Sequence, residues 1–110
     1  MENLVIYQRV YDLMLYLFPI IDRFPKYEKF VLCTQVKNCI IDIARHIIKA
    51  NKSRNKRTLL YNIDVFIEEL RLLVRLSHDR KYLAHKSYEE TSKRVNEIGR
   101  LLGGWIKSSG

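Results

Sequence analysis

The chain has 110 residues and a mass of 13.2 kDa, which is enough for one domain and too little for two separate hydrophobic cores. Apolar residues make up 47% and charged residues 29%, a balance that is typical of globular proteins and excludes a disordered chain. Four Gly and two Pro leave little material for turns, which argues against a sheet protein, and the formal net charge of +8 indicates an anionic partner.

The first predicted element is an amphipathic helix over residues 4–24, because apolar residues recur there at steps of three and four. A second apolar row, which includes Tyr7 and Tyr11, widens this face beyond what one small bundle needs. We expect these tyrosines to lie either in the core or in a subunit interface. Pro19 removes a helix hydrogen bond and predicts a bend, and Pro25 ends the segment. The predicted core residues are Ile6, Val10, Leu13, Leu17, Ile20 and Phe24.

The longest apolar run and the two cysteines indicate the cellular compartment. The run covers residues 13–21, nine residues against the roughly 20 that cross a bilayer, and it has no basic leader or small-residue cleavage site. Cys33 and Cys39 are six residues apart on one predicted helix, on well-separated faces, so they do not bridge each other. Free thiols fit a reducing cytosol, and we expect a cytoplasmic protein without membrane contact.

Three further amphipathic helices are predicted over residues 27–50, 56–79 and 87–107. Ser87 is the expected N-cap of the last helix, with Glu90 completing a capping box. Long helices joined by short connections predict an all-α protein, an antiparallel up-down four-helix bundle formed by one domain over residues 1–110. The predicted core residues are Cys33, Val36, Ile40, Ile43, Ile47 and Ala50 in the second helix, Leu59, Ile63, Phe66, Leu70 and Leu73 flanked by Leu60, Ile67 and Val74 in the third, and Tyr88, Val95, Ile98, Leu102 and Trp105 in the fourth.

The positive charge is concentrated in one part of the chain, since residues 37–58 hold seven basic residues against Asp42 alone. We call residues 49–57, KANKSRNKR, the basic elbow; its cations are Lys49, Lys52, Arg54, Lys56 and Arg57. Further cations follow as a stripe along the third predicted helix and past its end: Arg71, Arg75, His78, Arg80 and Lys81. Such a surface favours a phosphate backbone, whose neutralisation releases condensed counterions. A solvated face that only keeps the protein soluble is the alternative.

No motif for reading bases or holding a cofactor is present. The chain has no zinc-finger spacing, RNP signature, glycine-rich KH loop or helix-turn-helix pattern, so we expect backbone contacts to RNA, and to DNA, with little sequence preference. The helical spacing of the tyrosines favours core or interface over base stacking. Three histidines, His46, His78 and His85, do not form a metal motif, and we expect no metal and no cofactor.

One enzymatic pattern is present as an alternative. Arg80 and His85 are separated by four residues ahead of the last predicted helix, an arrangement that resembles the Arg-x(4–6)-His motif of HEPN ribonucleases. There His85 would accept the proton of a ribose 2′-hydroxyl while Arg80 stabilised charge on the phosphate. The motif is short, and an Arg-rich chain produces it by chance, so a polar loop explains the same residues.

The whole chain resembles a known family. FPKYEKF (24–30), expected to open the second helix, resembles the four-helix-bundle family that includes the 23S ribosomal RNA intervening-sequence proteins. The segments ELRLLVRLSHD (69–79) and EIGRLLGGWIKS (97–108) resemble the accessory variability determinant (Avd) family of diversity-generating retroelements.

This resemblance implies a non-catalytic four-helix subunit of a pentameric ring with a basic surface. The ring would bind the reverse transcriptase of the retroelement and its template RNA, and so support mutagenic cDNA synthesis. By the same resemblance, Arg71 and Arg75 contact the polymerase or nucleic acid, while Gly99, Gly103 and Trp105 are packing residues. The basic elbow matches no motif of the family, so its role rests on charge.

Overall fold

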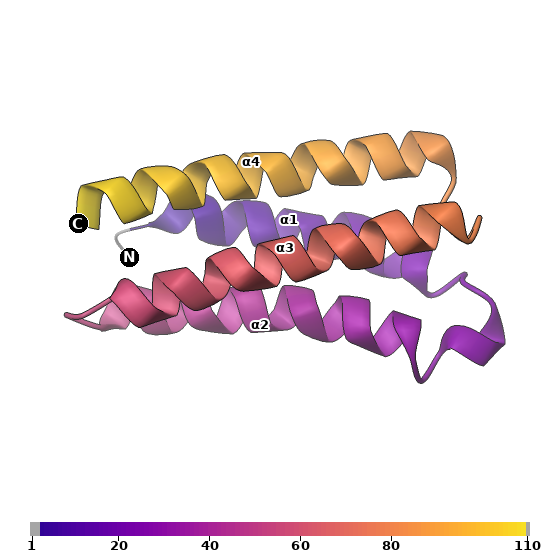
Figure 1. Cartoon of the computed structure of the whole chain (residues 1–110), viewed down its shortest axis with the longest axis horizontal. Coiled ribbons are helices and arrows are strands. Elements are labelled where there is room, and N and C mark those ends of the chain that lie inside the picture. The colour runs from indigo at the N-terminus through magenta and orange to yellow at the C-terminus, as the bar shows by residue number, and fades with distance from the viewer. Residues whose placement is uncertain (1–2, 110) are drawn as a thin grey trace.

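The computed structural model describes residues 3–109 and confirms an all-α bundle (Figure 1). Its elements are α1 (Leu4–Ile21), the short 3-10 helix η1 (Lys26–Glu28), α2 (Leu32–Lys52), α3 (Arg57–Asp79) and α4 (His85–Ser109). Successive helices run in opposite directions, and the packed neighbours are α1 with α2, α2 with α3, α3 with α4, and α4 with α1. The bundle measures 42 × 25 × 20 Å. The basic elbow therefore lies at the end of the bundle that carries both termini, and η1 lies at the other (Figure 1).

The core runs along the bundle axis and matches the predicted rows in α2 and α4 closely. In α3 the buried row is displaced by one residue from the main predicted row. Leu59, Phe66 and Leu73 of the predicted row are only half-buried, and the residue after each of them is buried. Two apolar rows lie side by side on α3, and packing between α2 and α4 selects one of them. The buried α3 residues are Leu60, Ile63, Ile67, Leu70, Val74 and Ser77.

The observed helix boundaries differ from the predicted ones by one to five residues at several helix ends. α1 ends at Ile21, although Phe24 beyond it is still buried. α2 begins at Leu32 and not at residue 27, because Pro25 is extended and the following residues form only a 3-10 turn. α4 begins at His85, so Ser87 lies inside the helix and is not its N-cap.

α1 has the length and composition expected of a membrane span, although the longest uninterrupted apolar run in the sequence covers only residues 13–21. Its 18 residues have a mean hydropathy of 1.4, and 28% of them are buried. Core helices meet the same criterion, and Ile6, Val10 and Leu13 of α1 lie in the bundle core. Of its tyrosines, Tyr7 and Tyr16 pack against that core, whereas Tyr11 is exposed.

Cys33 and Cys39 are free, as predicted, and both are buried, although only Cys33 was expected in the core. The Cys39 thiol donates to the Phe66 carbonyl oxygen at 3.2 Å, and burial raises its pKa to about 12. Burial also raises the pKa of Cys33. Both are therefore thiols at neutral pH, and a structural role explains them.

Candidate nucleic-acid interface

The basic elbow comprises the last turn of α2, a four-residue connection from Ser53 to Lys56, and Arg57 at the start of α3. The Lys56 ammonium folds back and donates to the carbonyl oxygens of Ala50 and Ser53 at the end of α2, and the Ala50 oxygen also accepts the Ser53 backbone N–H at 3.3 Å. The Ser53 hydroxyl donates to the Lys49 carbonyl oxygen at 2.8 Å. Lys56, predicted as a binding residue, thus has a structural part in closing the elbow.

The other elbow cations are exposed and face solvent. Within residues 3–109, the side chains of Lys49, Lys52, Arg54 and Arg57 form no hydrogen bond or ion pair. The dipole of α2 favours Lys49 and Lys52 in its last turn, and neither pairs with a carboxylate of residues 3–109. Of the predicted cations, these four form the cluster with the most uncompensated charge.

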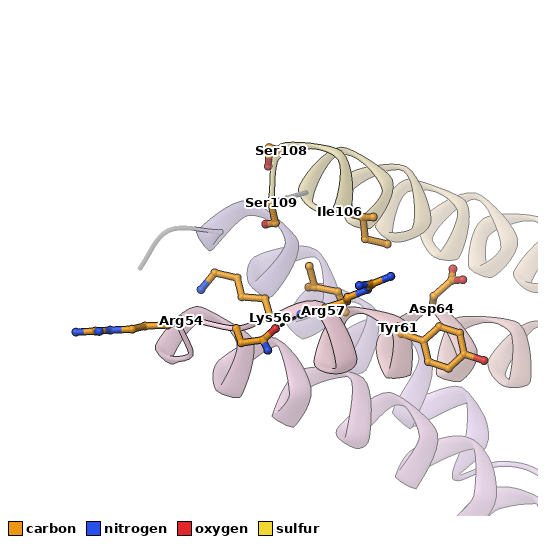
Figure 2. Close-up of a pocket in the computed structure, with 10 residues that line it drawn as sticks. Arg54, Lys56, Arg57, Tyr61, Asp64, Ile106, Ser108 and Ser109 are labelled. Carbon is orange, nitrogen blue, oxygen red and sulfur yellow. Dashed lines mark hydrogen bonds between the residues drawn. The ribbon is translucent and has the colours of Figure 1, made fainter.

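A cavity of about 820 Å³ opens beside the elbow, between the start of α3 and the end of α4 (Figure 2). We call it the elbow groove. In Figure 2, Arg54 points away from the bundle, whereas Arg57 extends toward the side of α3 that carries Tyr61 and Asp64. The residues that line the groove are Arg54, Asn55, Lys56, Arg57, Leu60, Tyr61, Asp64, Ile106, Ser108 and Ser109.

Tyr61 is a groove residue that the sequence analysis did not single out. It follows buried Leu60 by one residue and Arg57 by four. Its helical position relative to the buried residues of α3 is the feature of the sequence that indicated a place outside the core. Ile106, Ser108 and Ser109 come from α4. Nothing local in the sequence connects them to the elbow, because only the packing of α4 on α3 brings them there.

Arg71 and Arg75 lie on α3 between the two ends of the bundle, and both have acidic partners. Half-buried Arg71 pairs with Glu68 and donates to Asn96 Oδ1 of α4 at 3.4 Å. A Cβ on Gly99 would lie 3.0 Å from Arg71 Nη2, so the absence of a side chain there admits the guanidinium. Arg75 is more exposed and pairs with Asp79 at 3.7 Å.

The other two residues of the glycine-rich signature differ from each other. Trp105 is buried at 2% exposure, as the resemblance implied. A Cβ on Gly103 or Gly104 would meet no atom within 4 Å, so neither glycine is needed for packing inside one subunit.

Arg80 and Lys81 lie at the opposite end of the bundle from the elbow, so the nine predicted cations are distributed over both ends of the bundle and the part of α3 between them. Arg80 lies over the Tyr82 ring and donates to its hydroxyl at 3.2 Å, and this hydrogen bond raises the pKa of Arg80. The Tyr82 hydroxyl in turn donates to Glu28 Oε2 at 2.9 Å. Lys81 has a positive φ of 66°, which ends the turn after α3.

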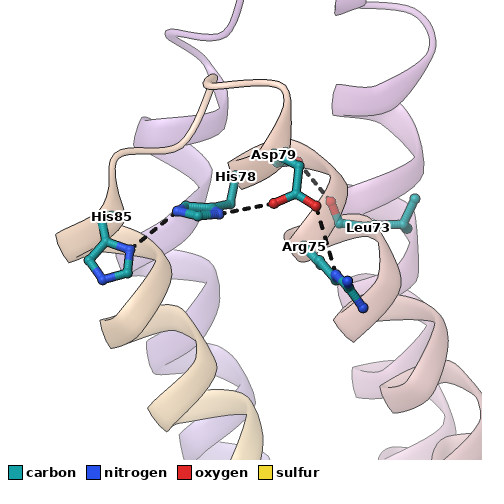
Figure 3. Close-up of polar contacts among 6 residues, drawn as sticks. Leu73, Arg75, His78, Asp79 and His85 are labelled. Atoms are coloured by element: carbon teal, nitrogen blue, oxygen red, sulfur yellow. Dashed lines mark hydrogen bonds and ion pairs between the residues drawn. The ribbon is translucent and has the colours of Figure 1, made fainter.

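His85, the first residue of α4, lies beside His78 near the end of α3 (Figure 3). Its Nδ1 lies 3.2 Å from His78 Nε2, and its Nε2 lies 2.7 Å from Glu89 Oε1. His78 stacks on Tyr88 with ring centroids 4.2 Å apart. Among the contacts of residues 3–109, Arg80 and His85 share none: Arg80 contacts Tyr82, whereas His85 contacts His78 and Glu89. No group of side chains in that part of the chain has the composition and spacing of a metal site.

Comparison with known proteins supports the resemblance carried by the sequence. No curated protein matches the chain. The model of a protein family described as bAvd-like matches residues 4–109, which is nearly the whole chain and includes all four helices. This four-helix bundle therefore belongs to the bAvd-like family.

Proposed function

We propose that this chain is a non-catalytic accessory protein of a diversity-generating retroelement. In this role it binds the reverse transcriptase of the element and its RNA, and DNA through the same backbone contacts, as a cytoplasmic homo-oligomer of five subunits. Membership of the bAvd-like family supports the retroelement assignment. The observation that carries nucleic-acid binding is the cluster of Lys49, Lys52, Arg54 and Arg57, exposed cations without a carboxylate partner within the described chain.

The predicted contacts divide into two groups under this proposal. Lys49, Lys52, Arg54 and Arg57 of the elbow bind phosphates, since their exposed side chains form no hydrogen bond or ion pair within residues 3–109. Arg75, Arg80 and Lys81 form a second cationic surface toward the far end of α3, suited to another part of the RNA or to the polymerase. Arg71 contributes mainly by holding α3 against α4, because its guanidinium is already occupied by Glu68 and Asn96.

Two exposed apolar rows support the homo-oligomer. Leu15 of α1 is 61% exposed and Leu72 of α3 is 66% exposed, and each has apolar neighbours on the same helix face. These helices are diagonal in the bundle, since α1 packs on α2 and α4. Two different apolar faces on opposite sides of a subunit favour head-to-tail contacts, which close into a ring when the rotation allows. The rows are Leu4, Tyr11 and Leu15 on α1, and Val65, Leu72 and Leu76 on α3.

Salt-dependent binding tests the nucleic-acid part of this proposal. The wild-type chain should bind single-stranded RNA with an affinity that falls steeply as salt rises. The double variant Arg54→Gln, Arg57→Gln should reduce the slope of log affinity against log salt by about 1.4, since each phosphate contact on a single strand contributes about 0.7. Fluorescence anisotropy with a labelled RNA at several salt concentrations measures this slope.

The matched control removes two other exposed arginines, Arg45 and Arg100, each of which pairs with a carboxylate of its own helix. The variant Arg45→Gln, Arg100→Gln has the same net charge as the elbow variant but should keep most of the wild-type slope. Equal losses in the two variants would show that net charge, and not the elbow, drives binding. Affinity that does not change with salt would contradict the proposal outright.

A further inference from the structure

We propose that the elbow groove is a base-stacking subsite for single-stranded nucleic acid, in which the Tyr61 ring stacks on a base and Arg57 binds the adjoining phosphate. The inference rests on the proposed nucleic-acid binding and specifies the form of the strand. It also departs from the sequence-based expectation, which confined contacts to the phosphate backbone. The groove residues that carry the argument are Arg57, Leu60, Tyr61, Asp64 and Ile106.

Tyr61 presents a free aromatic face in this groove. Its side chain is 65% exposed and, within residues 3–109, forms no hydrogen bond, ring contact or cation contact. Ile106 of α4, which is 42% exposed, adds apolar surface to the groove, whose lining also includes buried Leu60. An unpartnered aromatic ring next to apolar side chains suits a flat nucleobase, which has two π faces whatever its identity.

The charges beside Tyr61 suit the rest of a nucleotide. Arg57 precedes Tyr61 by four residues, so the two side chains emerge on the same face of α3 one turn apart. Figure 2 shows the Arg57 side chain extending toward Tyr61 and Asp64, and it forms no ion pair within the described chain. A phosphate on the Arg57 guanidinium thus places its own base within reach of the Tyr61 ring.

The carboxylate of Asp64 distinguishes this groove from a site that binds phosphate alone. Its carboxylate lines the same cavity and has no hydrogen-bond or ion-pair partner among the described residues. A carboxylate repels phosphate but accepts hydrogen bonds from exocyclic amino groups of bases and from ribose hydroxyls. Those groups are available together with a free base face in a single strand, whereas duplex bases are stacked away from an aromatic side chain.

The test compares two probes that have equal numbers of phosphates: a short single-stranded oligoadenylate and a chain of abasic spacers. The full chain and its Tyr61→Ala and Tyr61→Phe variants are titrated with each probe. Tyr61→Ala should weaken oligoadenylate binding about tenfold, the loss typical of one stacked base. It should leave the abasic chain unaffected, and Tyr61→Phe should behave as wild type because stacking needs the ring and not the hydroxyl.

The control variant is Tyr27→Ala, which removes a tyrosine of similar exposure at the opposite end of the bundle. It should keep the wild-type ratio of the two affinities. Circular dichroism and light scattering of each variant check that the helices and the subunit number are unchanged.

Two results would overturn the inference while leaving the proposed function in place. In one, Tyr61→Ala weakens both probes equally or weakens neither, while the variant Arg54→Gln, Arg57→Gln still weakens both. In the other, Tyr61→Ala changes the subunit number and leaves the ratio of the two affinities unchanged, which would assign Tyr61 to a subunit contact. If the wild-type chain binds neither probe at low salt, the proposed nucleic-acid binding itself fails, and the inference fails with it.

Discussion

At the residue scale, similar side chains in this protein have different tasks because of what surrounds them. Lys56 closes a helix end, Arg71 holds two helices together, and Arg57 meets solvent. Glycines differ in the same way: Gly99 makes room for the Arg71 guanidinium, whereas Gly103 borders open space. Residue type alone therefore does not identify the binding residues. The partners of each side chain do.

The two exposed glycines of α4 provide a residue-scale prediction. Replacing Gly103 or Gly104 by Ala should raise the free energy of unfolding by up to about 1 kcal/mol, because alanine costs less backbone entropy in a helix and the added methyl meets nothing within 4 Å. Urea denaturation measures the change. Each variant serves as the control for the other. If Gly103→Ala alone lowers the free energy of unfolding or the number of subunits in the oligomer, Gly103 makes a contact in the assembly.

At the element scale, the connections of this bundle determine where its chemistry lies. The α2–α3 connection is short because Lys56 satisfies carbonyls at the end of α2 while Arg57 starts the next helix. The α1–α2 connection is longer and contains η1, and it places Tyr27 and Glu28 beside Tyr82 at the other end. Each end of the bundle thus has its own polar cluster, and at the elbow end a cavity is lined by Arg54 and Arg57, whose side chains form no ion pair within residues 3–109.

The closing role of Lys56 can be separated from binding. Lys56→Met should lower the free energy of unfolding by about 1–2 kcal/mol, because it removes charge-assisted hydrogen bonds to the Ala50 and Ser53 carbonyls. Lys52→Met removes the same charge from an exposed side chain and should change stability by less than about 0.5 kcal/mol. Chemical denaturation measures the free energy of unfolding of both variants. Equal values for the two would show that Lys56 does not stabilise the end of α2.

At the scale of the whole molecule, the bundle has exposed apolar residues on each of two diagonal helices and a basic end beside the start of α1 and the end of α4. The apolar rows run along the sides of the bundle, and the elbow groove lies at its end. Head-to-tail contacts through the sides would therefore leave the groove open in every subunit. A ring built in this way presents several equivalent basic ends to one nucleic-acid strand, which raises avidity without new contacts.

Complementation of two variants tests the head-to-tail contact. Leu15→Arg should disable the α1 face and Leu72→Arg the α3 face, so each variant alone should have the mass of the 13.2 kDa monomer. Mixed at high concentration, they should form a dimer, since one intact pair of faces remains. Light scattering measures the mass.

Asn38→Arg, which places the same charge on an exposed polar position of α2, should keep the wild-type mass. Wild-type mass in both leucine variants would exclude these rows as the interface.

The sequence by itself determined the helix number, the antiparallel order and most of the core of α2 and α4, because apolar residues at helical spacing are a local signal. It also located the basic elbow, since charge density along a chain can be counted directly. It left the rotation of α3 open, as two apolar rows run along that helix and only packing chose between them.

The tertiary structure alone decided which cations are available and what stands beside them. Arg71 is occupied because it donates to Asn96 of α4. Tyr61 of α3 borders a groove because Ile106 of α4 lines the same cavity. These neighbours are far apart in the chain, and their contact depends on how far each helix is rotated when the shared core closes. No local pattern encodes that rotation, because it is the joint outcome of side-chain packing on every face of the bundle.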